Sequence, residues 1–377
     1  MGIQSFTPTS GGQPGQTFID QVYLTYKVRR WVRAGSPGFY RATSALGKDG
    51  FVYFLQTDNT LVQAPINGIA NVTLPFTEIR ILATQFDMIS LYKVSAKGTD
   101  SLTLTPNYTK ITSSGNYAFP TNSVGFADAW LIGGGGQAVH HGGGGGGGGI
   151  TEVISAPLAV GATVNIVIGA VGGDTIFQGR RASRGGPGND NADALTGYPT
   201  AGGSGSGSGT NNRNRIAGDG GAATIAYDKS LSTYLATLGT ALSVPLPEQD
   251  IISRYPTPIT PANHTGGGCS DSLGGHIGGG GGGIGGAGVN SSNSHNHGGP
   301  GGAPITGHSP WGITSLGVHS VGAGGHGGRH TPNSDNNTRP PYPTGFDANG
   351  YGNGSNSRHS STDGGTGGVA WVRTWSV

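Results

Sequence analysis

Runs of glycine constrain this chain more than any other feature of its sequence. Eight consecutive glycines occupy positions 142–149, and glycine-rich runs recur as far as 364–368. Glycine offers no side chain to a hydrophobic core, and ordering it costs more backbone entropy than ordering any other residue. A segment of this composition folds only if its backbone N–H and C=O groups find partners elsewhere in the protein.

The glycines are concentrated in one part of the chain. Residues 1–132 hold 12 of the 76 glycines, and residues 133–377 hold the other 64. The composition therefore indicates two zones. Together with the strand patterns, it predicts a β docking or attachment domain at 1–108 and a glycine-rich domain at 109–377.

The first zone has the pattern of a small β-domain. Residues 18–32 and 79–94 are rich in β-branched and aromatic side chains, residues 50–55 follow a turn signal, and residues 102–105 alternate with a period of two. These are strand signals, and no helical period accompanies them. The zone contains no histidine and no catalytic motif, so we expect a binding module.

Three structures are compatible with glycine runs. A flexible Gly/Ser linker is the simplest. Collagen requires a strict Gly-X-Y repeat, which the alternation of Gly and Ser at 205–209 excludes. The third structure is a set of packed polyproline-II-type helices made of glycine, which hydrogen-bond to one another because such helices have no internal hydrogen bonds. Interior helices would then be all glycine, as at 142–149 and 278–283, and edge helices would repeat Gly-Gly-X, as at 298–303.

Strand-like segments lie on both sides of the glycine runs and favour the packed structure over a linker. We expect a β clamp at 115–132, a hairpin at 153–168 that turns near Gly161, and a terminal strand at 369–375 that pairs with the clamp. The predicted fold class is mainly β and irregular: a small N-terminal β-domain followed by a bundle of polyglycine or polyproline-II-type helices clamped by short β-strands.

The order of these segments carries a family resemblance. Trp-Leu-Ile-Gly-Gly-Gly-Gly at 130–136 is followed by the segment 167–177, by Gly-Gly-X-Gly blocks, and by Gly-Gly-Val-Ala-Trp-Val-Arg-Thr-Trp at 367–375. This combination resembles the glycine-rich domains of tailed-bacteriophage tail-fibre and receptor-binding proteins, of the T-even-like phage adhesin type. The resemblance covers residues 109–377, apart from a long insertion at 222–265, and does not extend to residues 1–108.

The resemblance implies a virion protein that is made in the host cytoplasm and binds a bacterial surface receptor, either a polysaccharide or an outer-membrane protein. Residues 1–108 would attach it to other tail or fibre proteins, and both a homotrimer and a single capping subunit are compatible with the family. The main alternative is a purely structural virion component, such as a head fibre, baseplate or tail decoration. A cellular matrix or ice-binding protein is a third class, but ice binding needs a flat repeated face, which the irregular segment 329–349 lacks.

In the resembled adhesins, the loops that join the glycine helices recognise the receptor. With antiparallel helices, alternate connections share an end, so 303–321 and 355–363 are expected at one tip and 329–349 at the other. Aromatic rings pack on sugar rings and anchor protein interfaces, although each ring could instead fill an end of the bundle. The candidate contact residues are Tyr198, Tyr255, His308, Trp311, Tyr342, Phe346 and Tyr351.

The chemistry-bearing motifs are weak, and we predict no enzyme, no catalytic residue, no cofactor and no metal site. The pairs His295/His297 and His140/His141 could ligate a metal, particularly across subunits, but each occurs once and an ordinary polar loop is the alternative. Residues 185–193 match one calcium-binding nonapeptide, but a β-roll needs tandem copies. No Gly-X-Ser-X-Gly elbow stands between a strand and a helix, and no paired carboxylates form a motif.

Charge and cysteine content exclude further classes. The net charge is +2 and only 11% of residues are charged, which is unlike a nucleic-acid-binding protein with a clustered basic face. The single cysteine, Cys269, rules out an internal disulfide framework. No apolar run of about 18 residues and no signal peptide pattern is present, so we expect no membrane insertion.

Overall fold

The computed structural model describes most of the chain. The described residues are 15–24, 28–31, 33–83, 87–95, 97, 100–120, 122–138, 143–188, 270–272, 275–277, 280–286, 288–289, 301–325, 327, 329–330, 350–357, 362–363 and 365–377. None of them lies in an α-helix, and the only helical turns among them are the 3-10 turns η1 (Pro310–Gly312) and η2 (Thr314–Leu316). The prediction of a mainly β chain is confirmed.

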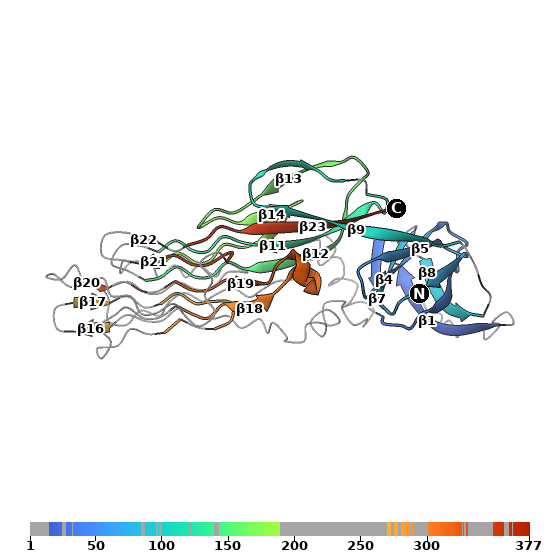
Figure 1. The fold of residues 1–377 in the computed structure, drawn as a ribbon, viewed down its shortest axis with the longest axis horizontal. Coiled ribbons are helices and arrows are strands. Elements are labelled where there is room, and N and C mark those ends of the chain that lie inside the picture. The colour runs from blue at the N-terminus through green and yellow to red at the C-terminus, as the bar shows by residue number, and fades with distance from the viewer. Residues whose placement is uncertain are drawn as a thin grey trace, which may run out of the picture.

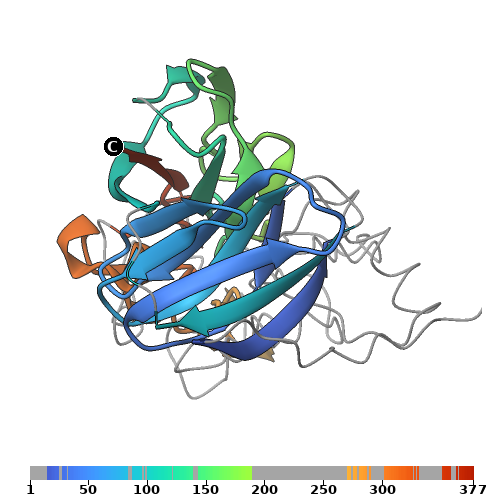
Figure 2. The same ribbon diagram turned by 90° about the vertical axis from the view of Figure 1, so that its right-hand side faces the viewer.

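The N-terminal part is a sandwich of antiparallel strands at one end of an elongated molecule (Figures 1 and 2). A four-stranded sheet has the order β1-β8-β3-β6. It packs on an eight-stranded sheet with the order β12-β11-β23-β9-β5-β4-β7-β2. The strands that come from residues 1–111 are β1 (Gln16–Leu24), β2 (Val28–Trp31), β3 (Gly38–Ser44), β4 (Gly50–Gln56), β5 (Leu61–Pro65), β6 (Ile69–Val72), β7 (Phe76–Ala83), β8 (Asp87–Val94) and β9 (Leu102–Ile111).

Strand β4 shows why the sequence of this zone is so apolar. Val52 and Phe54 face the core between the two sheets, whereas Tyr53 and Leu55 face a second core on the other side. Because successive side chains of a strand point to opposite faces, a strand buried on both sides needs apolar residues at every position. The continuous apolar run at 52–55 is explained by this double burial, whereas Phe51 is exposed.

The eight-stranded sheet curls into a nearly closed barrel. Its two end strands, β2 and β12 (Ile150–Pro157), approach each other, and Arg30 on β2 is attracted to Glu152 on β12. Strand β23 (Val369–Ser376) lies in the middle of this sheet, between β11 (Phe126–Ile132) and β9. The expected pairing of the clamp with the terminal strand is confirmed, since Trp130 stands opposite Trp371.

The two composition zones share this sheet. Strand β9 contains the expected boundary at residue 108, and it pairs with β23 over seven residues, from Ile111 opposite Ala370 to Thr105 opposite Ser376. Trp375 is fully buried in a core with Tyr53 and Leu104 of the first zone. The C-terminal strand is therefore part of the N-terminal barrel.

The segment 153–168 differs from expectation. It contains β12 and β13 (Thr163–Val167), but β12 pairs with β11, and β13 pairs with β10 (Gly115–Ala118) and β14 (Thr175–Phe177). The two strands are not a hairpin. They pack face to face around a shared core that includes Val153 and Ile166, because both carry an apolar face that edge-to-edge pairing would leave uncovered. Strand β15 (Arg180–Ala182) completes the sheet β10-β13-β14-β15.

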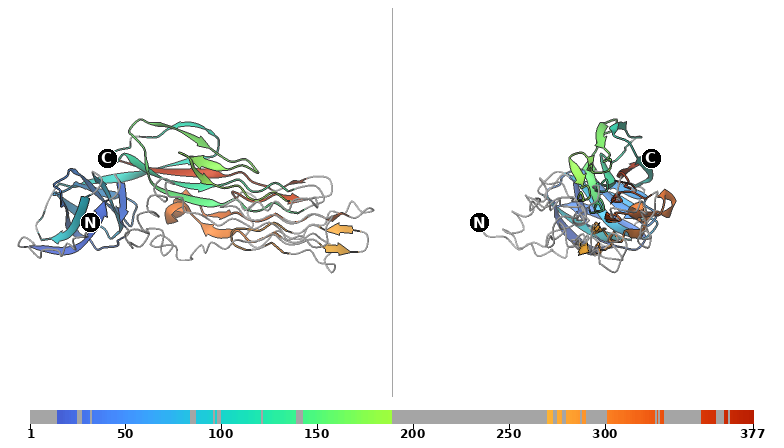
Figure 3. Two further views of the ribbon diagram at one scale, coloured as in Figure 1. Left: turned by 180° about the vertical axis from the view of Figure 1, so that it is seen from behind. Right: turned by 90° about the vertical axis from the view of Figure 1, so that its left-hand side faces the viewer.

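The glycine segments run side by side away from the barrel and form the long arm of the molecule (Figures 1 and 3). The far end of this arm, which we call the tip, carries the short strands β16 (Ser270–Ser272), β17 (Gly275–Ile277), β20 (Arg329–His330), β21 (Asn356–Ser357) and β22 (Thr362–Asp363). Strands β18 (Ile305–His308) and β19 (His319–Val321) lie at the barrel end of the arm. Segments 303–321 and 355–363 were expected at one tip, but they reach opposite ends. Strand β20 lies at the tip, whereas Tyr351 bridges to Val321 at the barrel end, so the expected alternation of ends breaks between residues 330 and 351.

Candidate functional site: glycine arm and tryptophan junction

Hydrogen bonds between glycine segments follow a period of three. The N–H groups of residues 133–136 donate to three different neighbouring segments, and the fourth donor returns to the same segment as the first. The donor and acceptor pairs are Gly133 to Gly149, Gly134 to Gly173, Gly135 to Thr366 and Gly136 to Gly146.

The central run 145–149 repeats this pattern. Its first and fourth N–H groups donate to segment 352–355, its second and fifth donate to segment 183–186, and its third donates to a third segment. The pairs are Gly145 to Ser355, Gly146 to Gly186, Gly147 to Gly282, Gly148 to Gly352 and Gly149 to Ser183. The run therefore has partners on three sides.

The segments pack so closely that a Cβ atom has no room. A Cβ at Gly147 would lie 2.0 Å from the carbonyl oxygen of Gly322, and one at Gly135 would lie 1.8 Å from that of Asn353. The obstacle is backbone in both cases, so it cannot rotate away. Glycine is required at these positions because of close approach, without any positive φ.

Three of the predicted contact residues lie together at the barrel end of the arm. His308 and Trp311 come from β18 and η1, and Tyr351 bridges to Val321. The other predicted contact residues, Tyr198, Tyr255, Tyr342 and Phe346, and the metal candidates His295 and His297 lie outside the described residues.

These three side chains pack against what we call the tryptophan junction, the apolar cluster of Trp130, Ile132, Ile150, Ile284, Val321, Val369 and Trp371. The ring of His308 meets Trp130 edge-on at 5.2 Å between centroids, and Tyr351 meets Trp371 at 5.6 Å. The ammonium of Lys110 lies 5.2 Å above the ring of Tyr351. The junction joins the arm to the barrel, and all three predicted residues are half-buried in it.

Beneath the junction lies a buried ionic network that the sequence interpretation missed. The Asp128 carboxylate is fully buried and accepts hydrogen bonds from both terminal nitrogens of Arg80, at 2.9 and 2.8 Å, and from Arg373. Arg80 also binds Glu78, and Glu78 binds Arg30. The sequence did contain one signal for it, because Asp128 is a charged residue within the otherwise apolar segment 126–132.

Burial alone would raise the pKa of Asp128, but the guanidinium groups of Arg80 and Arg373 outweigh it and hold that pKa below its ordinary value of 3.8. The Arg80 guanidinium also lies 5.3 Å from the ring centre of Phe126 and 5.2 Å from that of Trp375. The network thus connects β7, β11 and β23 through one carboxylate.

A bulge in β12 completes the network and gives a prediction. Ser155 has φ +54° and donates its backbone N–H to Asp128 at 2.9 Å, while its buried hydroxyl has no hydrogen-bond partner among the described residues. We expect Ser155→Gly to raise the free energy of unfolding by about 1 kcal/mol, because it relieves the left-handed backbone and removes the unsatisfied hydroxyl. Urea denaturation would measure this. Ser155→Ala keeps the strained backbone and should gain less, so an equal gain from both variants would contradict the strain argument.

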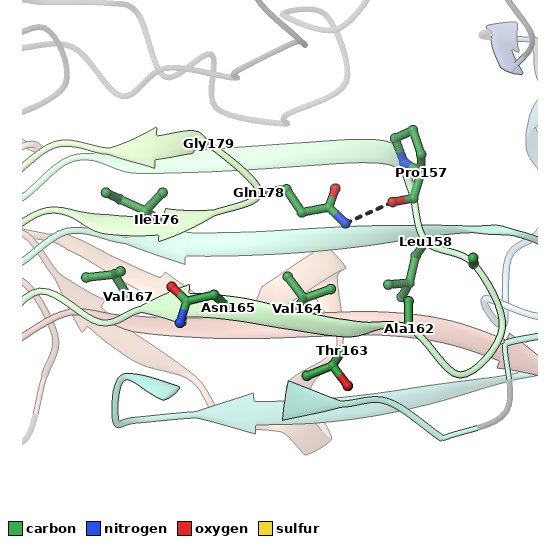
Figure 4. Close-up of a pocket in the computed structure, with 11 residues that line it drawn as sticks. Pro157, Leu158, Ala162, Thr163, Val164, Asn165, Val167, Ile176, Gln178 and Gly179 are labelled. Atoms are coloured by element: carbon green, nitrogen blue, oxygen red, sulfur yellow. Dashed lines mark hydrogen bonds between the residues drawn. The ribbon is translucent and has the colours of Figure 1, made fainter. Parts of the chain in front are cut away.

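A shallow groove lies on the flank of the barrel end (Figure 4). Its volume is about 470 Å³, and it runs along β13, with Thr163 and Asn165 on one side. Gln178 closes the other side and donates its amide N–H to the Pro157 carbonyl at 2.8 Å. The remaining lining residues are Leu158, Ala159, Ala162, Val164, Val167, Ile176 and Gly179. None of the lining residues is ionisable, so the groove offers hydrogen bonds and apolar contact but no acid–base group.

The described residues contain no group of three His, Cys, Asp or Glu side chains placed to hold a metal ion. They also contain no helix long and apolar enough to cross a membrane. Comparisons of the chain with family models, curated proteins and solved structures gave no match.

Proposed function

We propose that the chain is a bacteriophage tail-fibre or receptor-binding protein, an adhesin that binds a bacterial surface receptor through connections carried on a bundle of polyglycine II helices. The observation that supports the scaffold is the period of three in the hydrogen bonds of residues 133–136 and 145–149. The receptor is a polysaccharide or an outer-membrane protein, and no catalysis is involved.

The period distinguishes polyglycine II helices from strands. In a β-strand, backbone groups alternate between two neighbours, because the repeat is two residues. A polyproline-II-type helix has about three residues per turn, so its N–H groups point in three directions and return every third residue. The three-way partners of 145–149, and the absence of space for any Cβ at Gly147, favour such a helix at the centre of a bundle.

The shape of the molecule supports a division of roles. The barrel end is compact, and strand pairing and buried ion pairs hold it together. The arm ends in a tip, where connections begin or end at β16, β17, β20, β21 and β22 (Figure 1). Binding residues commonly sit on connections held by a rigid scaffold. We therefore assign receptor recognition to the tip connections and attachment to other virion proteins to the barrel end.

The purely structural role remains the second candidate, and one observation favours it. The three described contact candidates, His308, Trp311 and Tyr351, pack in the tryptophan junction at the opposite end from the tip. Their aromatic character is accounted for by packing. Receptor recognition thus depends on residues such as Tyr342 and Phe346, which lie in the connection that follows β20.

Binding of the fluorescently labelled full chain to a panel of bacterial cells tests the proposal. We expect binding to a restricted set of strains and competition with adsorption of the parent phage. A variant with residues 331–349 replaced by a Gly/Ser link should lose both, with a melting temperature close to that of the parent chain. The matched control replaces the exposed residues 159–161, far from the tip, and should keep full binding.

Two results would count against the adhesin role. Absence of binding by a folded chain to every strain that the phage infects would leave the structural role. Equal loss of binding in the control variant would mean that the arm tip is not the contact surface.

A further inference from the structure

The connection between β18 and β19 forms a strap that packs against residues of β9, β11 and β23. We call residues 309–318 the strap. Its two ends are His308 and His319, which stand directly opposite each other in the β18–β19 ladder. Cross-strand neighbours of this kind have Cβ atoms about 5 Å apart. The two imidazoles therefore stand side by side where the strap begins and ends, a place that we call the neck of the strap.

Both imidazoles rest on tryptophan rings. His308 meets Trp130 at 5.2 Å, and His319 lies 5.3 Å from Trp371 and 5.3 Å from Tyr351. The Nε2 atom of His308 is buried and has no hydrogen-bond partner among the described residues. This site favours the neutral imidazole, because no described acceptor or carboxylate lies within hydrogen-bond distance of that nitrogen to stabilise the protonated ring.

The strap covers the edge of the buried ionic network. Trp311 lies with its ring 4.7 Å from the Arg373 guanidinium, and Trp375 lies 4.9 Å from the same group on the network side. Trp311 has φ +51° and ψ +22°, a left-handed conformation that is costly for a bulky side chain. The closed strap is held by these ring contacts against local backbone strain.

The charges around the neck are mostly positive. Lys110 on β9 lies 5.7 Å above Trp371, and Arg373 on β23 lies under the strap. Of the nearest carboxylates, Asp128 is bound by Arg80 and Arg373, and Glu152 on β12 is attracted by Arg30. Asp58, in the turn between β4 and β5, acts on Tyr108. Tyr108 and Tyr351 are the other titratable neighbours. Two imidazolium ions here would repel each other and the adjacent Lys110 and Arg373.

We propose that His308 and His319 form an acid-sensitive latch, and that protonation of this pair on acidification releases the strap from the tryptophan junction. Burial lowers the pKa of His308 from its ordinary value of 6.5 in the closed strap. The released strap has the ordinary value, so it binds protons first as the pH falls. The closed strap is therefore fully stabilised above about pH 6.5, and it loses that stability as the pH falls below this value. The loss comes above the pH at which Asp128 is protonated. The latch is independent of what the tip binds.

Hydrogen exchange measured by mass spectrometry on the full chain tests the latch. After correction for the intrinsic pH dependence of exchange, we expect amides of residues 305–321 to exchange at least tenfold faster at pH 5.5 than at pH 7.5. Amides of β4 and β7 should not change. The double variant His308→Phe/His319→Phe keeps aromatic packing but cannot be protonated, and its exchange in 305–321 should not depend on pH. His264→Phe, outside the described residues, should behave as the parent chain does.

Either of two results would overturn the latch. One is pH-independent exchange of 305–321 in the parent chain, which needs no variant to fold. The other is an equal acid response in the double variant, which would assign the response to different groups. Tryptophan fluorescence of the parent chain gives a second readout, since release of the strap exposes Trp311 and should shift emission to longer wavelength between pH 7.5 and 5.5.

Discussion

Gly147→Ala should destabilise the protein by about 3 kcal/mol or more, the upper range for inserting a methyl group into a packed interior. The new Cβ would lie 2.0 Å from the Gly322 carbonyl oxygen and 2.5 Å from its carbonyl carbon. Relief requires one glycine segment to move away from the other. That movement would weaken the hydrogen bond from the Gly147 N–H to the Gly282 carbonyl, which is 2.9 Å long. Thermal melting followed by circular dichroism should show a decrease of roughly 4 °C or more.

Gly286→Ala is the matched control for this prediction. It lies in the same glycine-rich zone, but the nearest atom to its Cβ is the Cβ of Ala303 at 3.5 Å, an ordinary contact. Because alanine has less backbone entropy to lose on folding, the substitution should be neutral or stabilising by up to about 1 kcal/mol. Similar losses from both substitutions would mean that the arm depends on glycine for flexibility rather than for close packing.

Asp128→Asn should cost about 3–5 kcal/mol at neutral pH, the range found when one partner of a buried ion pair is removed. The substitution leaves the guanidinium of Arg373 without its carboxylate and leaves Arg80 with Glu78 alone. Both arginines are almost completely buried. Urea denaturation at pH 7 measures the loss. The control is Asp20→Asn, which breaks the exposed ion pair with Arg33 and should cost less than about 1 kcal/mol.

The same carboxylate predicts a dependence on pH. Because the pKa of Asp128 in the folded protein lies below 3.8, the unfolded chain takes up the proton first as the pH falls. Its contribution to stability is therefore complete above about pH 5 and declines below pH 4 toward the folded-state pKa. Asp128→Asn should remove that part of the acid response. An unchanged slope of stability against pH between 5 and 3 would show that other carboxylates dominate acid unfolding.

The strands were predictable where a local pattern determines them. The apolar run of β4 and the pairing of the segments around Trp130 and Trp371 follow from hydrophobicity at the two borders of the glycine zone. The hairpin predicted at 153–168 was wrong because the turn near Gly161 is a local signal, whereas the choice of a pairing partner depends on distant strands. The glycine runs indicated that closely packed segments would form, but they did not indicate the direction in which each segment runs.

The candidate site was predictable only in part, for a physical reason. His308, Trp311 and Tyr351 have the composition of contact residues, and aromatic side chains in a connection look alike whether they face a receptor or fill a junction. The ionic network joins residues that are 48 and 245 positions apart in the chain. No spacing rule connects Arg80, Asp128 and Arg373, so only the three-dimensional arrangement identifies them.

The central position of strand β23 sets the order in which this protein can fold. It fills the gap between β9 and β11, and the contact of Asn107 with Ser376 spans 269 positions. A chain with contacts this distant folds slowly, because the entropy of closing the loop is lost before the contacts form. Until β23 inserts, the edges of β9 and β11 are open to other strands, a state prone to aggregation. We therefore expect the folding nucleus to form among strands β1–β8. The glycine arm should assemble last, after β23 has paired with both β9 and β11.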